Sequence, residues 1–280
     1  MNDYSIINGE FVLKNESKIL ISDLSVQRGY GIFDYFRTNS FGPIFLEDHL
    51  DRFFYSASQM NLEAGFSRKE LQEMIFKLIE KNQIPDSGIR ITLTGGYSED
   101  GYSIAKPNLL ITQSPFSFNK ENFNKGIRLI TYQHQRQLPH VKTIDYLMAI
   151  YLQPFLKERN ADDLLYFDNN EIRECPRSNF FAVTEKDEVI TPAKKILKGI
   201  TRKKILAFSE FKTKEVSILL DDLSTIKEAF ITSTTKNILP VLEINGKPVG
   251  NGNPGAISQK IYKKMLLLKE NPNQINKRTL

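Results

Sequence analysis

The chain has 280 residues, of which 40% are hydrophobic and 25% charged, and its formal net charge is +5. This length and composition allow a large buried core, favour two domains and exclude a disordered or membrane-spanning chain. The single cysteine excludes an internal disulfide, and the three histidines show none of the spacings typical of a zinc site, so no metal is expected.

The N-terminal part of the sequence mixes strands with helices. The Asn8-Gly9 pair predicts a hairpin, because both residues tolerate positive φ. Apolar residues recur at helical spacing over residues 46–60 and again over 67–81, where a serine-to-glutamate capping box begins the second helix. Two short β-branched segments, bounded by Gly, Pro and Asn, then predict strands at GIRITLT and NLLITQSPF.

A polar stretch with no sustained periodicity, SPFSFNKENFNKG, predicts a linker and a domain boundary near Phe118. We therefore expect an α/β (α+β) fold with domains at 1–118 and 119–280. The expected elements of the second domain are a strand GIRLITY, a helix Thr143–Arg159, a strand pair DLLYFD and FFAVTE, a helix Thr201–Phe211 and a final helix from near Pro254.

Two residues have side chains suited to cofactor chemistry. Lys142 lies between a strand-like segment and an apolar stretch, where desolvation would disfavour its ammonium form, as imine chemistry requires. Glu174 follows a turn-rich segment, and a buried carboxylate there could keep a pyridine nitrogen protonated. A solvated helix-start lysine and an exposed hairpin glutamate are the ordinary alternatives.

Three further segments offer donors to an anion. LKGITRKK places Thr201 and free backbone N–H groups at the start of a helix. ITSTTKN places Ser233 and Thr234 at the end of an apolar strand, and Arg52 could bind a phosphate bidentately. Each segment alone is equally typical of a cap, a turn or a surface charge.

Taken in order, HLDR, a lone lysine before an apolar helix, RECPRSNFFAV, LKGITR and TSTTKNILPV resemble the motif series of the fold-type IV pyridoxal-phosphate enzymes. The resemblance covers nearly the whole chain, including NGEFV and RGYGIFDYFR. This family contains branched-chain aminotransferases, D-amino acid aminotransferases and aminodeoxychorismate lyases. It implies a smaller N-terminal α/β domain, a larger C-terminal domain with a β-barrel-like core, and a homodimer with its active site at the domain interface.

The resemblance also implies residue roles. Lys142 resembles the Schiff-base lysine and general base of a ping-pong amino transfer, and Glu174 resembles the partner of the pyridine nitrogen. Tyr146, one helical turn after Lys142, could hydrogen-bond the ring hydroxyl. The residues expected around the phosphate of pyridoxal 5'-phosphate are Arg52, Leu197, Ile200, Thr201, Ser233 and Thr234.

The signatures of substrate preference are incomplete. The R-x-H pair of D-amino acid aminotransferases is absent, and of the Y-x-R of branched-chain enzymes only Arg90 is present, with Gly88 in place of the tyrosine. Arg28, in a loop that can reach the neighbouring subunit in this family, could join Arg90 in binding carboxylates. Since STTKNILPV looks closer to the D-specific enzymes, we expect transfer from a D-amino acid to a 2-keto acid such as 2-oxoglutarate.

Several alternatives remain at this stage. Arg28 could instead pair with Asp34, and the aromatic residues Tyr30, Phe33 and Tyr97 could line the pocket or belong to the core. A branched-chain L-aminotransferase, an aminodeoxychorismate lyase and a non-catalytic pyridoxal-phosphate-binding protein are the competing functions. Scattered basic residues argue against a nucleic-acid partner, and with no signal-peptide pattern we expect a cytoplasmic protein that binds amino and keto acids.

Overall fold

The computed structural model describes residues 3–270, and the chain divides into two compact units. The first unit contains Met1–Ser117 and Val141–Asp145, and the second contains Phe118–His140 and Tyr146–Leu280. The segment Val141–Asp145 therefore makes its contacts with the first unit, although both of its flanks belong to the second. The sequence-based domain limits remain a proposal.

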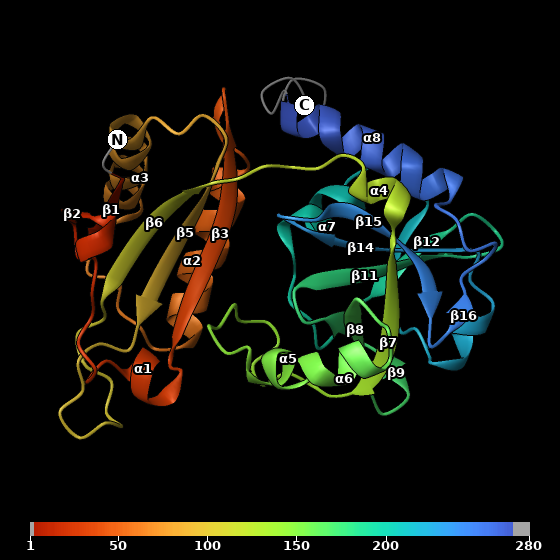
Figure 1. Ribbon diagram of the computed structural model, residues 1–280, viewed down its shortest axis with the longest axis horizontal. Helices are drawn as coiled ribbons and strands as arrows, with labels where there is room; N and C mark the ends of the chain where they lie inside the picture. Colours follow the sequence, from red (N-terminus) through yellow and green to blue (C-terminus); the bar gives the residue numbers. More distant parts are fainter. Residues whose placement is uncertain (1–2, 271–280) are drawn as a thin grey trace. The chain divides into compact units, whose positions relative to one another are not determined.

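The first unit is built on a six-stranded antiparallel sheet in the order β2-β1-β6-β5-β3-β4 (Figure 1). The predicted hairpin is confirmed, because Asn8 and Gly9 adopt φ of 51° and 92° between the first two strands. The strands are β1 (Tyr4–Ile7), β2 (Glu10–Leu13), β3 (Gly31–Asn39), β4 (Gly42–Pro43), β5 (Ser87–Thr94) and β6 (Leu109–Pro115).

Two helices bury their apolar faces against one side of this sheet and form its core. The predicted helices are confirmed as α2 (Leu46–Gln59) and α3 (Arg68–Asn82), and Ser67 and Glu70 make the predicted capping box. The shorter helical turns are η1 (Lys14–Glu16) and α1 (Leu24–Arg28). The core includes Ile32, Phe36, Leu50, Phe53, Leu71, Ile75, Ile89 and Ile91, all of them fully buried.

Alternation along β3 separates two sets of side chains. Because successive strand residues point to opposite faces, Ile32, Asp34 and Phe36 point towards the helices, and Phe33 and Tyr35 point to the other face of the sheet. The strand thus holds a buried polar side chain on one face and an aromatic pair on the other.

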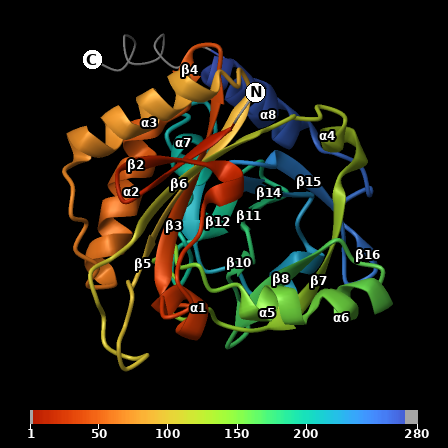
Figure 2. The ribbon, with the colours of Figure 1, turned by 60° about the vertical axis from the view of Figure 1, so that its left-hand side comes forward.

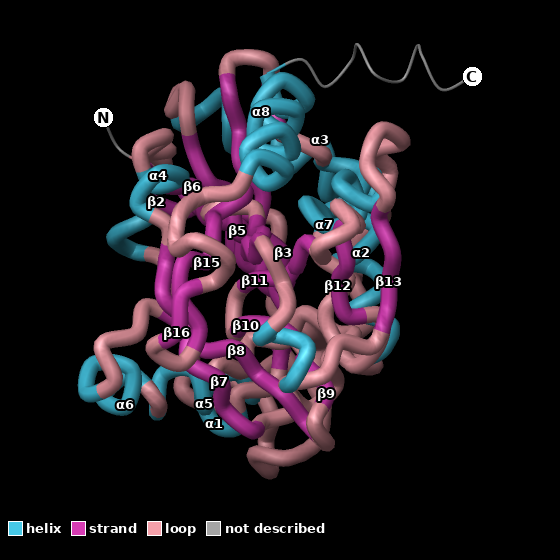
Figure 3. Tube along the Cα trace, turned by 90° about the vertical axis from the view of Figure 1, so that its right-hand side faces the viewer, coloured by secondary structure: helices cyan, strands magenta, loops and turns pink. Residues whose placement is uncertain are grey.

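The second unit contains a ten-stranded mixed sheet in the order β13-β12-β11-β14-β15-β7-β8-β9, with β10 beside β11 and β16 beside β15. Its strands curl, as Figures 2 and 3 show, so the predicted β-barrel-like core is confirmed. The strands are β7 (Ile127–Gln133), β8 (Asp163–Asp168), β9 (Glu171–Ile172), β10 (Glu174–Cys175), β11 (Ser178–Val183), β12 (Val189–Pro192), β13 (Thr213–Val216), β14 (Glu228–Ser233), β15 (Asn237–Ile244) and β16 (Lys247–Pro248).

The predicted pairing of DLLYFD with FFAVTE is wrong. These segments form β8 and β11, but β8 turns back into β9 and β11 pairs with β10, β12 and β14. The cause is the two-residue turn Asn169-Asn170, in which both residues have positive φ and close a tight hairpin.

The predicted helix Thr143–Arg159 is also wrong in its first part. Helix begins only at Leu147, as α5 (Leu147–Tyr151), and resumes as α6 (Gln153–Glu158) with Pro154 in its first turn. Thr143 forms a β-bridge with Ile32 of β3 instead, since a β-branched residue suits an extended segment beside a strand edge. Tyr146 precedes the helix and cannot be one helical turn after Lys142.

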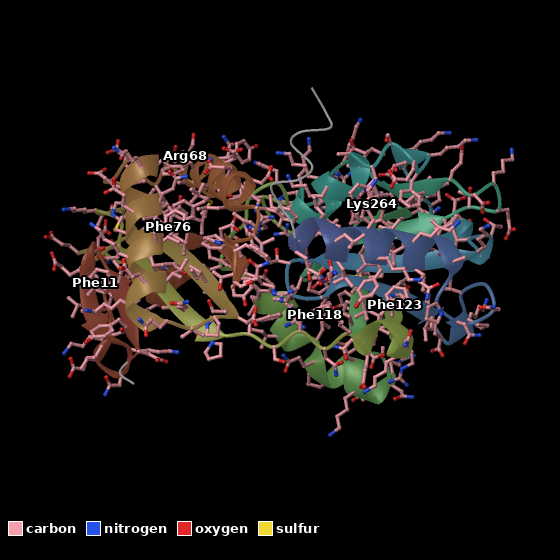
Figure 4. The ribbon with its side chains drawn as sticks, turned by 90° about the horizontal axis from the view of Figure 1, so that it is seen from above. Phe11, Arg68, Phe76, Phe118, Phe123 and Lys264 are labelled. Atoms are coloured by element: carbon pink, nitrogen blue, oxygen red, sulfur yellow. The ribbon has the colours of Figure 1, made fainter. Side chains whose placement is uncertain are left out.

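The remaining helices of the second unit are α4 (Asn122–Lys125), α7 (Ile200–Leu206), η2 (Asp221–Ser224) and α8 (Ala256–Glu270). The α7 helix ends before the predicted Phe211, because the buried Phe208 continues in a turn and donates its N–H to the carbonyl of Ile205. Phe123 of α4 stacks on Tyr262 of α8 with ring centroids 4.4 Å apart (Figure 4). Among residues 3–270, no helix has the length and apolar character needed to cross a bilayer.

Candidate active site

Lys142 lies on an extended segment that continues the edge of β3. Its carbonyl accepts the N–H of Phe33 at 3.0 Å, and its own N–H donates to Ser56 Oγ at 3.3 Å. Two residues on, the N–H of Ile144 donates to the carbonyl of Gly31 at 3.1 Å. Backbone hydrogen bonds on both sides therefore fix the position of the lysine, as a strand would.

The side chains of Lys142, Phe33 and Arg90 meet on one face of the first unit. Lys142 Nζ lies 4.4 Å from the centroid of the Phe33 ring, and the guanidinium carbon of Arg90 lies 3.8 Å from the same centroid. A buried aromatic ring attracts both cations through its quadrupole. The structure thus brings together three residues that the sequence analysis named for catalysis, pocket and carboxylate binding.

Behind them, Asp34 forms a buried cluster with His49 and Arg52 of α2. Asp34 accepts from Arg52 Nε and Nη2, each at 2.8 Å, and lies 2.7 Å from His49 Nδ1. Burial alone would raise the pKa of Asp34, but Arg52 and His49 hold it well below its ordinary value. Burial lowers the pKa of His49 despite the attraction of Asp34, and Lys142 lowers it further.

Arg52 is the member of this cluster that the sequence pattern predicts as a phosphate-binding residue. Its Nη1 makes no hydrogen bond to a residue within 3–270, so this nitrogen can still donate to a phosphate oxygen. The sequence gives only weak indications of the partners Asp34 and His49. Asp34 is an acid within the apolar segment GIFDYF, and His49 lies three positions before Arg52 on the same face of a helix.

Asp34→Asn is expected to lower the free energy of unfolding at neutral pH by about 3 kcal/mol, because it leaves the Arg52 guanidinium without its buried counter-charge. The folded-state pKa of Asp34 is depressed, so its stabilisation is present above the unfolded value of 3.8 and is lost as pH falls below it. Urea unfolding at several pH values should therefore show a weaker acid dependence in the variant.

The exposed Asp221→Asn is the matched control for this prediction. It should leave the neutral-pH stability within about 0.5 kcal/mol of the wild type and the acid dependence unchanged. An Asp34→Asn protein as stable as the wild type would contradict the assigned charge cluster.

In the second unit, Glu174 is buried and its two oxygens accept from different partners. Arg136 Nε donates to Oε1 at 2.9 Å, and the backbone N–H of Leu197 donates to Oε2 at 3.0 Å. The exposed hairpin glutamate considered as an alternative is therefore excluded. A guanidinium partner favours the charged form of a carboxyl group over the neutral one. Sequence analysis missed Arg136, which lies in the irregular segment HQRQLP.

The turn before α7 is tied to the sheet by Asn179, the cross-strand partner of Glu174. Its Nδ2 donates to the carbonyl of Leu197 at 2.6 Å, and its Oδ1 accepts the N–H of Gly199 at 3.2 Å. Gly199 is the N-cap of α7, and no side chain caps the first-turn N–H groups of Ile200 and Thr201. These groups are free to bind an anion, as at other helix N-termini.

Gly199→Ala is expected to weaken pyridoxal-phosphate binding about tenfold. An added Cβ would lie 2.2 Å from Asn179 Oδ1, although the backbone of Gly199 is compatible with alanine, so the turn must shift away from its anchor. Titration of apo-protein with the cofactor measures the dissociation constant. Gly65→Ala, where the new methyl meets nothing within 4 Å, is the matched control and should bind as the wild type does; equal affinities in the two variants would contradict the prediction.

Ser233 and Thr234 lie where β14 turns into β15. Ser233 Oγ accepts the N–H of Lys236 at 3.0 Å, which fixes the turn, and Thr234 is half-buried beside it. Thr232, one residue earlier, is cross-strand to Asn179 and thus on the face that carries Glu174. Its buried hydroxyl has no hydrogen-bond partner within residues 3–270.

Three of the residues named for the substrate pocket lie in different surroundings. Tyr30 donates its hydroxyl to the carbonyl of Met60 at 2.6 Å and packs on the core. Tyr97 lines a separate cavity in the first unit, and Arg28 is exposed at the end of α1. The proposed pairing of Arg28 with Asp34 is wrong, because that acid is already bound by its two helix partners.

The residues of the second unit fit a phosphorylated pyridine. Glu174 supplies a buried carboxyl group for a ring nitrogen, while Ile200, Thr201 and the unpartnered Thr232 supply donors for oxygen atoms. Within the described residues no group of three or more His, Cys, Asp or Glu side chains could hold a metal ion.

The model of the family described as amino-transferase class IV matches residues 31–244, and the chain belongs to this family. The predicted family is thus confirmed, and with it the enzyme class, a pyridoxal-phosphate-dependent aminotransferase.

Among curated relatives, the chain is 30% identical over 267 residues to the D-alanine aminotransferase of Staphylococcus aureus (strain COL), covering 91% of this chain and 94% of the relative. It is 26% identical to the D-alanine aminotransferase of Bacillus licheniformis, at 91% and 93% coverage. The branched-chain amino acid aminotransferase of Escherichia coli has the same fold, with a TM-score of 0.89 at 22% identity and coverage of 96% of this chain and 95% of that one.

Proposed function

We propose that this enzyme transfers an amino group from a D-amino acid to a 2-keto acid such as 2-oxoglutarate in a ping-pong cycle. The observation that supports the proposal is that Arg90 and Lys142 both contact the buried Phe33 ring, so a cation suited to a carboxylate lies close to the proposed catalytic amine. Relatives at 26–30% identity that are D-alanine aminotransferases support the D preference.

Four sets of residues would hold the cofactor. Lys142 would bind it covalently through Nζ, Glu174 would accept a hydrogen bond from the ring nitrogen, and Tyr146 would serve the ring hydroxyl. The phosphate would take donors from Arg52, Leu197, Ile200, Thr201, Ser233 and Thr234. When bound, pyridoxal phosphate supplies an electron-withdrawing ring and a carbonyl carbon that accepts an amine.

Two side chains of this protein would handle protons in the reaction, Lys142 at the substrate's α-carbon and Glu174 at the ring nitrogen. The Nζ of Lys142 would remove the proton from the substrate's α-carbon and return it as the general acid. Glu174, which accepts a hydrogen bond from Arg136, would hold a proton on the ring nitrogen. Arg90 would bind the α-carboxylate in place of the missing R-x-H pair, with Arg28 reaching it from the neighbouring subunit, and this contact would orient the α-hydrogen towards Nζ.

Steady-state assays with D-alanine, D-glutamate, L-glutamate and L-leucine, each with a suitable keto acid, test the proposal. We expect turnover of the D-amino acids. Turnover of L-leucine alone would overturn the D assignment and favour the branched-chain reaction, whose fold this chain shares. Pyruvate release from aminodeoxychorismate without an amino acceptor would indicate a lyase, and cofactor binding without turnover would indicate a non-catalytic protein.

We propose in addition that the enzyme acts as a homodimer in the cytoplasm. Exposed apolar side chains on α5, among them Leu147, Ile150 and Tyr151, are consistent with a covered surface in an oligomer. Sedimentation of the purified enzyme tests the assembly, and a monomer at micromolar concentration would contradict it.

A further inference from the structure

On strands β3, β5 and β6 of the first unit, one face of the sheet carries two arginines and no acidic residue. Strand alternation places Phe33, Tyr35 and Arg37 of β3 on the same face as Arg90 of β5. The other residues on this face of β3, β5 and β6 are Gly31, Asn39, Gly88, Thr92, Thr94, Leu110, Thr112 and Ser114, none of them acidic. The acid that acts on Arg37 is Asp86, which precedes β5. Such a face is suited to an anionic ligand.

Tyr35 occupies the space that a side chain at position 88 would fill. A Cβ built on Gly88 would lie 1.7 Å from the Tyr35 hydroxyl and 2.4 Å from its Cζ. The absence of a side chain at Gly88 is therefore what allows the phenol to lie flat along β5. The Y-x-R pattern would have a tyrosine at position 88 of β5. Here Tyr35 of the neighbouring strand β3 lies beside that position instead.

The Tyr35 hydroxyl points away from Lys142 Nζ. Arg90 and Lys142 both contact the ring of Phe33, which is cross-strand to Thr92. Tyr35 lies two residues further along β3, about 7 Å away, and its hydroxyl extends onward over Gly88. This face thus has two separate places where a carboxylate could bind, one at Arg90 beside Phe33 and one at the Tyr35 hydroxyl over Gly88.

Arg37 supplies the cation at the second point. It is cross-strand to Gly88, and its guanidinium lies 4.3 Å from the centroid of the Phe116 ring, which holds it in place. The Tyr35 hydroxyl makes no hydrogen bond to a residue in the described range, and burial raises the pKa of this phenol. It therefore stays protonated and can donate to a carboxylate.

We propose that Tyr35 and Arg37 bind the second carboxylate of dicarboxylic substrates, the side-chain carboxylate of glutamate and the distal carboxylate of 2-oxoglutarate. The proposal rests on the proposed function, because it takes Arg90 to bind the α-carboxylate beside Lys142. Gly88 is the positioning residue that allows the Tyr35 phenol to reach this point.

Tyr35→Phe tests the proposal because it removes only the hydroxyl. We expect KM for glutamate and 2-oxoglutarate to rise about tenfold, the loss of one hydrogen bond to a charged group, with KM for alanine and pyruvate and all kcat values within about twofold. Glutarate, which cannot react, should bind about tenfold more weakly by calorimetry, while butyrate binding should not change. Tyr102→Phe, an exposed tyrosine, is the matched control.

Gly88→Ala provides an independent variant, since its methyl must displace the phenol. It should reproduce the dicarboxylate defect, and Gly65→Ala, where a methyl has open space, should not. Unchanged glutarate affinity in Tyr35→Phe, or equal losses for mono- and dicarboxylic ligands, would overturn the proposal. If the enzyme prefers L-amino acids, the proposed D preference is wrong, but the proposed binding of the second carboxylate can still be tested. In that case the effect of Tyr35→Phe on KM for L-glutamate is compared with its effect on KM for L-leucine.

Discussion

Lys142→Ala is expected to lower kcat for amino transfer by about a thousandfold. If Lys142 has its proposed roles, the variant loses both the amine that binds the cofactor and the base that moves the α-proton, and each role is typically worth orders of magnitude. Because Lys142 is held by its backbone to β3 and Ser56, the loss of its side chain should leave the fold intact. Single-turnover assays, with circular dichroism to check folding, measure the effect.

Lys77→Ala, an exposed lysine on α3, is the control and should retain full activity. A small primary amine added to Lys142→Ala should restore part of the rate, since it can replace the missing base. A variant with more than about a tenth of the wild-type kcat would rule out Lys142 as the catalytic amine.

The second large effect is expected at Glu174. Glu174→Gln should lower kcat about a hundredfold, because a neutral amide cannot hold a proton on the ring nitrogen. The amide oxygen can still accept the N–H of Leu197, but Arg136 loses its counter-charge. The kcat of the cofactor-saturated enzyme measures the electronic effect apart from binding.

Glu185→Gln changes an exposed glutamate beyond the end of β11 and serves as the control. Thermal unfolding of both variants separates a loss of chemistry from a loss of stability. If Glu174→Gln kept kcat within about threefold of the wild type, the carboxylate would have no role in activating the ring.

Local signals predicted the elements whose chemistry is complete within a few residues. The turn at Asn8-Gly9 needs only two residues that tolerate positive φ, and the capping box of α3 needs only Ser67 and Glu70. For the same reason, the resemblance identified Glu174 and the turn before α7, since each lies within a short motif.

Contacts between distant segments could not be predicted. The apolar stretch after Lys142 predicts a helix. Instead, Thr143 forms a β-bridge with Ile32 at the edge of β3, more than a hundred residues earlier in the chain. The ion pair of Arg136 with Glu174 joins residues 38 positions apart, and no local pattern marks it. Likewise, the sequence shows only that Gly88 stands where branched-chain enzymes have a tyrosine. It does not show that the Tyr35 phenol from the neighbouring strand fills the space beside Gly88.

The return of Val141–Asp145 to the first unit has a consequence for the order in which the protein matures. When the ribosome has released residues up to Ser117, every strand and helix of that unit has been synthesised except the piece that completes the edge of β3. The first unit is therefore complete only after the next 28 residues have been synthesised, and a fragment cut at residue 117 lacks Lys142. Since the second unit begins before that piece and resumes after it, neither unit corresponds to one uninterrupted stretch of the sequence.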